Sequence, residues 1–109
     1  MFEVSGHNYI AGARSAKGSN TLQSHDASTG EALPFRFHQA SVEEVNTAAE
    51  AAATAYPVFR NLSAARRADF LDVIATELEA LDDTFIALVC RETALPAGRI
   101  QGERARTSG

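Results

Sequence analysis

One amphipathic stretch constrains this chain more than any other feature: residues 61–81, NLSAARRADFLDVIATELEAL. Its large apolar residues recur every three or four positions, which is the spacing of one face of an α-helix. They are Phe70, Leu71, Ile74, Leu78 and Leu81. Ser63 stands at the start, where its hydroxyl can accept a hydrogen bond from a free backbone N–H. We therefore predict a helix from about Ser63 to Leu81 whose stripe faces other helices, with Phe70, Ile74 and Leu78 buried.

The residues before position 39 carry a different pattern, which favours short strands joined by turns. The extended candidates are 7–12 (HNYIAG), 20–25 (NTLQSH) and 32–38 (ALPFRFH). Phe35 and Phe37 alternate with polar neighbours in the last of these, although Pro34 restricts it to a sheet edge or a strand start. The segment 13–19 predicts a loop, and 26–31 (DASTGE) is a dense turn signal. Together these segments predict an antiparallel β-meander or hairpin.

Beyond residue 38 the pattern becomes helical and predicts about four helices. Ser41 and Glu44 are spaced as a capping box, in which each side chain bonds the other residue's backbone N–H. In the helix that follows, one face collects Val42, Val45, Ala49, Ala52 and Tyr56. We expect Pro57 to end or bend this helix, because proline has no backbone N–H. A third helix is expected to begin at Asp82 or Asp83.

The fourth helical stretch begins near Pro96 and reads AGRIQGERARTSG. It has almost no apolar residue beyond Ile100, so as a helix it has little surface to bury. Such an ending is unusual for a finished domain. We expect an α/β fold in which the arm and strands of 1–38 and the helical part, 39–109, are together an incomplete portion of a larger domain.

The composition bounds both the size of the chain and its partners. Its 109 residues are 45% hydrophobic, but alanine supplies much of that share, so we expect a thin core. A formal net charge of -4 argues against a nucleic-acid partner. No apolar run approaches the roughly 20 residues that span a bilayer, and no secretory signal opens the sequence. We expect a cytoplasmic protein with no membrane partner.

No combination of residues forms a self-evident active site. Cys90 follows an apolar run late in the third predicted helix, which favours an inert, partly buried thiol over a nucleophile. His7, His25 and His38 are scattered and, with one cysteine, do not supply the three or four ligands of a zinc site. The dinucleotide and P-loop glycine motifs are both absent from the sequence. From the residues alone we predict no catalytic, cofactor-binding or metal-binding residue.

Five short segments follow one another in an order and spacing typical of a known family. They are NYIAG (8–12), DASTGE (26–31), the stretch 40–56, LSAARRA (62–68) and RETALP (91–96). Together they resemble the N-terminal segment of an aldehyde dehydrogenase and cover nearly the whole chain. The tail GRIQGERART (98–107) is similar to the branch that oxidises α-ketoglutaric semialdehyde. The chain departs from the family's usual Asn-Pro at Asp26-Ala27 and from its usual Gly-Lys at Ala94-Leu95.

The resemblance implies a fold, an activity and a set of partners. It implies that the chain is part of a Rossmann-like NAD(P)-binding domain in a parent enzyme that uses NADP or NAD. The parent would oxidise a small aldehyde through a cysteine thiohemiacetal, with its catalytic cysteine and glutamate outside this stretch. The implied partners are the rest of the enzyme chain and further copies, as a dimer or tetramer. Some relatives hold a cation at positions matching Ser24, His25 and Glu92, where Glu92 replaces the usual aspartate.

Two other hypotheses remain open from the residues. One is a small non-enzymatic helical interaction module that binds a partner through the alanine-lined helix. The other is a nucleic-acid contact through a late basic cluster, formed by Arg91, Arg99, Arg104 and Arg106. Such a contact would weaken steeply with added salt, whereas the enzyme hypothesis predicts a natural protein several times larger than 11.6 kDa.

Overall fold

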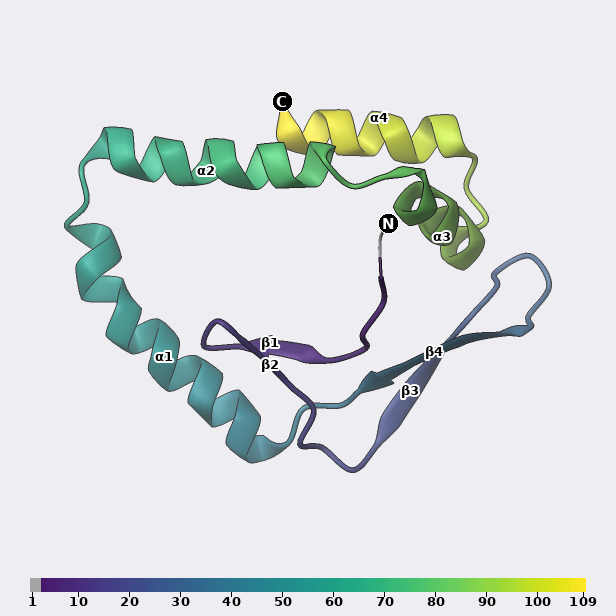
Figure 1. The fold of residues 1–109 in the computed structure, drawn as a ribbon, viewed down its shortest axis with the longest axis horizontal. Helices are drawn as coiled ribbons and strands as arrows, with labels where there is room; N and C mark the ends of the chain where they lie inside the picture. Colours follow the sequence, from purple (N-terminus) through teal and green to yellow (C-terminus); the bar gives the residue numbers. More distant parts are fainter. Residues whose placement is uncertain (1–2) are drawn as a thin grey trace. The chain divides into compact units, whose positions relative to one another are not determined.

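The computed structural model describes residues 3–109, in which four short strands precede four helices (Figure 1). The strands are β1 (Asn8–Ile10), β2 (Ala13–Ser15), β3 (Thr21–His25) and β4 (Ala32–His38). The helices are α1 (Val42–Arg60), α2 (Ala64–Glu79), α3 (Asp83–Thr93) and α4 (Ala97–Ser108). This order confirms the predicted α/β class, with N-terminal hairpins followed by about four helices.

The described chain divides into two compact units. We call the first the strand unit; it comprises Val4–Ser24 and Pro34–Leu62, and therefore includes α1. We call the second the helix unit; of the described residues it comprises Glu3, His25–Leu33 and Ser63–Gly109, and therefore includes α2, α3 and α4. Each unit is described separately below.

The strands form two antiparallel hairpins rather than one continuous meander. One two-stranded sheet joins β1 to β2 and another joins β3 to β4. The segment predicted as a loop, 13–19, instead begins with β2, whose Ala13 pairs with Ile10. Ala11 and Gly12 form the connecting turn with φ of 52° and 80°. Positive φ at both loop residues is the conformation that lets a two-residue turn close a hairpin.

Helix α1 begins as predicted and runs past Pro57, which was expected to end or bend it. The Ser41 hydroxyl accepts from the Glu44 N–H at 3.1 Å, and the Ser41 N–H donates to Glu44 Oε1 at 3.0 Å. This geometry confirms the capping box. Pro57 does not end the helix, which continues to Arg60, because a proline removes only one donor from the ladder.

The face of α1 that collects its larger apolar residues is largely open in the strand unit. Val42, Val45 and Tyr56 are exposed. The β1–β2 hairpin lies beside alanines of α1, where a shallow groove is lined by Tyr9, Ala11, Gly12, Ala48, Ala51, Ala52 and Ala55. Alanine side chains allow this approach because they project little from the helix.

Helix α2 forms where the stripe predicts it, but the predicted burial is wrong. Ser63 caps the helix, because its hydroxyl accepts from the Arg66 N–H at 3.2 Å. Phe70 is 51% exposed and Ile74 is 42% exposed, while Leu78 is half-buried. The reason is the partner: among the described helices α2 packs on α4, which is short and mostly polar.

Helices α3 and α4 complete the helix unit around a thin core. Asp82 caps α3, since its Oδ1 accepts the N–H groups of Thr84 at 3.1 Å and Phe85 at 3.4 Å. The helix ends at Ala94, whose φ of 59° is left-handed. In the described chain the buried hydrophobic residues are Leu33, Ile86 and Ile100, all in this unit. No helix among residues 3–109 is both long and apolar enough to cross a membrane.

Candidate functional site

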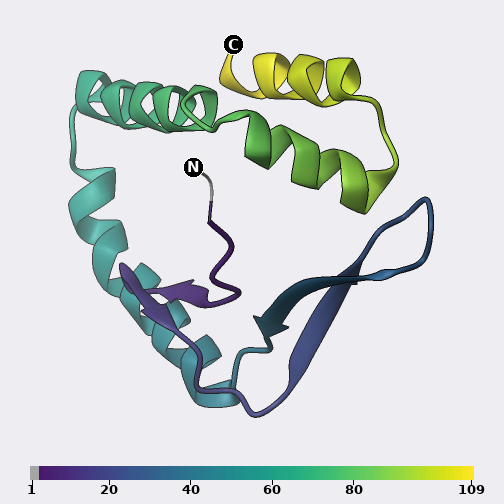
Figure 2. The same ribbon diagram turned by 45° about the vertical axis from the view of Figure 1, so that its right-hand side comes forward.

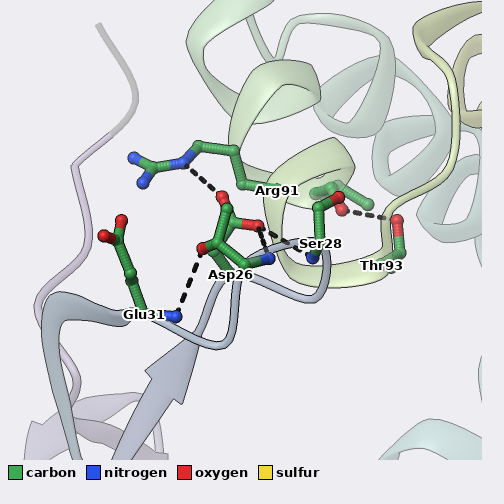
Figure 3. A network of polar contacts seen from close by, with 7 residues as sticks. Asp26, Ser28, Glu31, Arg91 and Thr93 are labelled. Atoms are coloured by element: carbon green, nitrogen blue, oxygen red, sulfur yellow. Dashed lines mark hydrogen bonds and ion pairs between the residues drawn. The ribbon is translucent and has the colours of Figure 1, made fainter.

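A polar network in the helix unit surrounds the turn 26–31 (Figure 3). Asp26 Oδ1 accepts the backbone N–H of Ser28 at 2.9 Å and that of Thr29 at 3.2 Å. The Asp26 carbonyl accepts the Gly30 N–H, and the Asp26 N–H donates to the Glu31 carbonyl, both at 2.8 Å. An aspartate that bonds its own backbone two residues on is the expected start of such a turn.

The turn is held against the end of α3 by Arg91. Its Nε lies 3.3 Å from Asp26 Oδ2, and its backbone carbonyl accepts the Ala27 N–H at 2.9 Å. Figure 3 shows the guanidinium reaching over the turn toward the Asp26 carboxylate. The contact therefore joins two of the segments that carry the family resemblance, DASTGE and RETALP.

This network holds the Asp26 carboxylate in its charged form. The Ser28 N–H is the largest influence that lowers the pKa of Asp26 below its ordinary value, and Arg91 adds to it. Both carboxylate oxygens already accept hydrogen bonds. Asp26 is therefore suited to fixing the turn and poorly suited to general acid or base chemistry near neutral pH.

A second polar cluster surrounds Glu44 in the strand unit. Glu44 is 2% exposed, and its Oε2 accepts a hydrogen bond from the Ser15 hydroxyl. Besides the Ser41 N–H, the backbone of Lys17 donates to the same carboxylate. These donors, led by Ser15, lower the pKa of Glu44 to about 2. The sequence predicted Glu44 as part of a cap, and the structure adds that it anchors the end of β2 and the following loop to the start of α1.

The other candidate residues stay apart from any reactive arrangement. Cys90 is a free, half-buried thiol in the last turns of α3. His7 and His38 lie in the strand unit with ring centroids 5.5 Å apart in an edge-to-face contact, which is a packing geometry. His25 is exposed. Within residues 3–109 there is no group of three or more His, Cys, Asp or Glu side chains that could hold a metal ion.

The cation positions implied by the resemblance remain a prediction. The Ser24 hydroxyl oxygen is buried and makes no hydrogen bond within the described chain. His25 and Glu92 are exposed and belong to the helix unit. The implied site would also use backbone carbonyls.

The late basic cluster is mostly neutralised by acids. Arg91 pairs with Asp26, Arg99 Nε lies 2.9 Å from Glu103 Oε1, and Arg104 Nε lies 3.6 Å from Glu79 Oε2. Arg106 is exposed. Paired guanidinium groups contribute little to phosphate attraction, so this arrangement argues against the nucleic-acid hypothesis.

The described residues do not fit a nicotinamide dinucleotide. A dinucleotide phosphate binds where a glycine-rich turn links a strand to a helix N-terminus. The strand-to-helix link among residues 3–109 is β4 to α1, and it passes through Gln39, Ala40 and Ser41 without glycine. Glu43 and Glu44 then stand in the first turn of α1, where their charge would repel a phosphate. The absence of a cofactor contact in this stretch stays a prediction.

The strand hairpins, the four helices and the order of their motifs agree with a family match over residues 14–108. The chain belongs to the aldehyde dehydrogenase family.

Two relatives make the comparison more specific. Alpha-ketoglutaric semialdehyde dehydrogenase of Acinetobacter baylyi is 37% identical over 109 residues, which are 100% of this chain and 21% of the relative. Alpha-ketoglutaric semialdehyde dehydrogenase 2 of Azospirillum brasilense is 41% identical over 102 residues, which are 92% of this chain and 19% of the relative. The chain therefore spans about a fifth of the length of these relatives, and its resemblance to this branch is confirmed.

Proposed function

We propose that this chain is the N-terminal scaffold portion of an NAD(P)-dependent aldehyde dehydrogenase that oxidises α-ketoglutaric semialdehyde to its carboxylate. The observation that carries the proposal is the similarity of the whole chain to relatives of that name. Family membership supports the general class of reaction, oxidation of an aldehyde. The substrate and the choice of NADP or NAD are the finer parts of the proposal.

The proposed chemistry takes place outside this stretch. In the parent enzyme a cysteine thiolate outside these residues would attack the aldehyde carbon, and a bound NADP or NAD would supply the electron acceptor for the oxidation. Water then hydrolyses the resulting thioester, which releases the carboxylate and restores the thiolate. The 109 residues contribute strands and helices to the cofactor domain, with 1–38 as arm and strands and 39–109 as its helical part.

The test uses the full-length protein and two kinds of aldehyde. Reduction of NAD or NADP is followed by absorbance with α-ketoglutaric semialdehyde and, as the matched control, with pentanal, which has the same chain length and no carboxylate. We expect a clear preference for the semialdehyde in kcat/KM. Equal or better oxidation of pentanal would contradict the proposed substrate but agree with the aldehyde dehydrogenase family. If neither aldehyde were oxidised, the proposed enzymatic activity would be wrong.

The alternative, a non-enzymatic helical interaction module, makes the opposite prediction about size. The intact mass of the protein from its source cell decides between them. A mass several times 11.6 kDa supports the enzyme, whereas a mass of 11.6 kDa supports the module. We further propose a cytoplasmic dimer or tetramer, which light scattering and cell fractionation would test.

A further inference from the structure

The apolar stripe of α2 is open over the part that α4 does not reach. Leu71 is 64% exposed and Ile74 is 42% exposed. No residue of α2 is buried within the described structure. Large aliphatic side chains that follow one another on a single helix face form a contiguous apolar surface, and such surfaces mark contacts with further polypeptide.

Helix α4 runs in the direction opposite to α2, and its C-terminal end lies beside the C-terminal end of α2 (Figure 1; Figure 2 gives the rotated view). Arg104 Nη1 donates to the Leu81 carbonyl at 2.7 Å, and the Ser108 hydroxyl bonds to Glu79. These contacts fix the direction and position of α4 at the C-terminal end of α2. Near the start of α4, Ile100 borders a pocket with Phe85 and Val89 of α3, whereas Thr107 and Ser108 near its end border a groove with Ile74 and Leu78 of α2.

A groove of about 300 Å³ opens where the two helices separate. It is lined by Leu71, Asp72, Ile74, Ala75 and Leu78 of α2 and by Thr107, Ser108 and Gly109 at the end of α4. The open apolar residues and the end of α4 therefore border the same groove. A further turn of helix after Gly109 would enter it directly.

We propose that in the full-length protein the polypeptide after Gly109 continues α4 along this groove and covers Leu71 and Ile74. This inference rests on the proposed function, under which this chain is about a fifth of the whole, as it is of the A. baylyi relative. A helix rises about 1.5 Å per residue, so roughly 10 more residues would reach the N-terminal end of α2. The α4 positions that face α2 recur at three and four residues, so we expect large apolar side chains one turn beyond Thr107 and Ser108.

The first test measures whether the stripe is covered. In the full-length protein, Ile74→Cys and Thr76→Cys are labelled separately with a maleimide, and the labelled peptide is quantified by mass spectrometry so that native cysteines do not interfere. Thr76 is the matched control, because two positions along a helix lie on nearly opposite sides and Thr76 is exposed. We expect Thr76→Cys to react at least tenfold faster. Equal rates would overturn the proposal.

The second test identifies what covers the stripe. Leu71→Cys is combined with a cysteine one turn after Gly109, and a short bismaleimide is added. A crosslink within one chain supports the proposal, whereas a crosslink between two chains assigns the groove to a second copy and overturns it. Neither crosslink, with Leu71→Cys reacting freely, also overturns it. Aldehyde oxidation by the unsubstituted protein is measured independently, so a failed substrate assignment is distinguishable from an open groove.

Discussion

Arg91 and Asp26 lie 65 positions apart in the sequence and are joined by an ion pair of 3.3 Å. The pair fastens the β3–β4 turn to the last turn of α3. Because Asp26 also accepts two backbone N–H groups, one side chain both shapes the turn and attaches it. Each of the following predictions applies to the full-length protein.

Asp26→Asn is expected to loosen this turn. The asparagine amide keeps one acceptor oxygen but has no negative charge to pair with Arg91. Its NH₂ group, itself a donor, would face either the Arg91 Nε–H or the backbone N–H groups of the turn. We expect the backbone amides of 26–31 to exchange with deuterium several-fold faster, measured by mass spectrometry. Glu31→Gln is the control, since hydrogen bonds from the backbone of Glu31, not its carboxylate, build the turn. Unchanged exchange in Asp26→Asn would contradict this role.

Glu44→Gln is expected to lower the melting temperature near neutral pH, with a specific pH dependence. The pKa of Glu44 falls from an ordinary value of 4.5 to about 2 in the folded state. A lowered folded pKa gives stability that is complete above pH 4.5 and is lost as the pH falls toward about 2. The difference between Glu44→Gln and the parent should therefore shrink across that window. Glu43→Gln, at the exposed neighbouring position, is the control, and an identical pH profile for the two variants would refute the prediction.

Gly6→Ala and Gly12→Ala distinguish two ways in which an added Cβ destabilises the strand unit: backbone strain at positive φ and steric overlap with a neighbouring atom. Both glycines have positive φ, of 69° and 80°, but a Cβ at Gly6 would lie 1.9 Å from the Arg36 carbonyl oxygen, while Gly12 has nothing within 4 Å. Left-handed backbone alone costs a residue with a Cβ about 1–2 kcal/mol. Denaturant unfolding should show about this loss for Gly12→Ala and a clearly larger one for Gly6→Ala. Equal losses would mean that the backbone shifts to remove the close approach.

Cys90→Ser is expected to retain aldehyde oxidation. Cys90 is half-buried in α3 and lies in no reactive cluster within residues 3–109. Kinetics should give kcat within about twofold of the parent, with at most the loss of about 1 kcal/mol in stability that a small core substitution brings. Loss of kcat at unchanged folding, shown by circular dichroism, would place Cys90 in the chemistry and contradict its assignment as structural.

Local features of the fold were predictable from the sequence, and long-range ones were not. The Ser41–Glu44 box and the Ser63 cap are set within three residues, so the sequence pattern contains them, while it left the cap of α3 open between Asp82 and Asp83. Strand β2 was missed because its turn uses Ala11-Gly12, where the usual hairpin signal is Asn-Gly or Asp-Gly. Hydrophobic periodicity does not predict the Ser15–Glu44 and Asp26–Arg91 contacts, because each joins residues that are far apart in the sequence.

The burial of α2 shows a different limit. The spacing of Phe70, Ile74 and Leu78 correctly identified an apolar stripe. Periodicity within one helix gives the apolar face, but it does not identify the polypeptide that packs against that face. Among the described residues the partner is α4, whose sequence is too polar and too short to cover the whole stripe. The prediction failed at the step from helix to packing, where information from other polypeptide is required.

The Asp26–Arg91 pair also has a consequence for synthesis on the ribosome. At about 5–20 residues per second, Arg91 is made roughly 3 to 13 seconds after Asp26. During that interval the turn depends on Asp26 Oδ1 and its neighbours Ser28 and Thr29, which emerge with it. The two oxygens of one carboxylate thus serve successive stages: one shapes the nascent turn, and the other docks it once α3 has been translated.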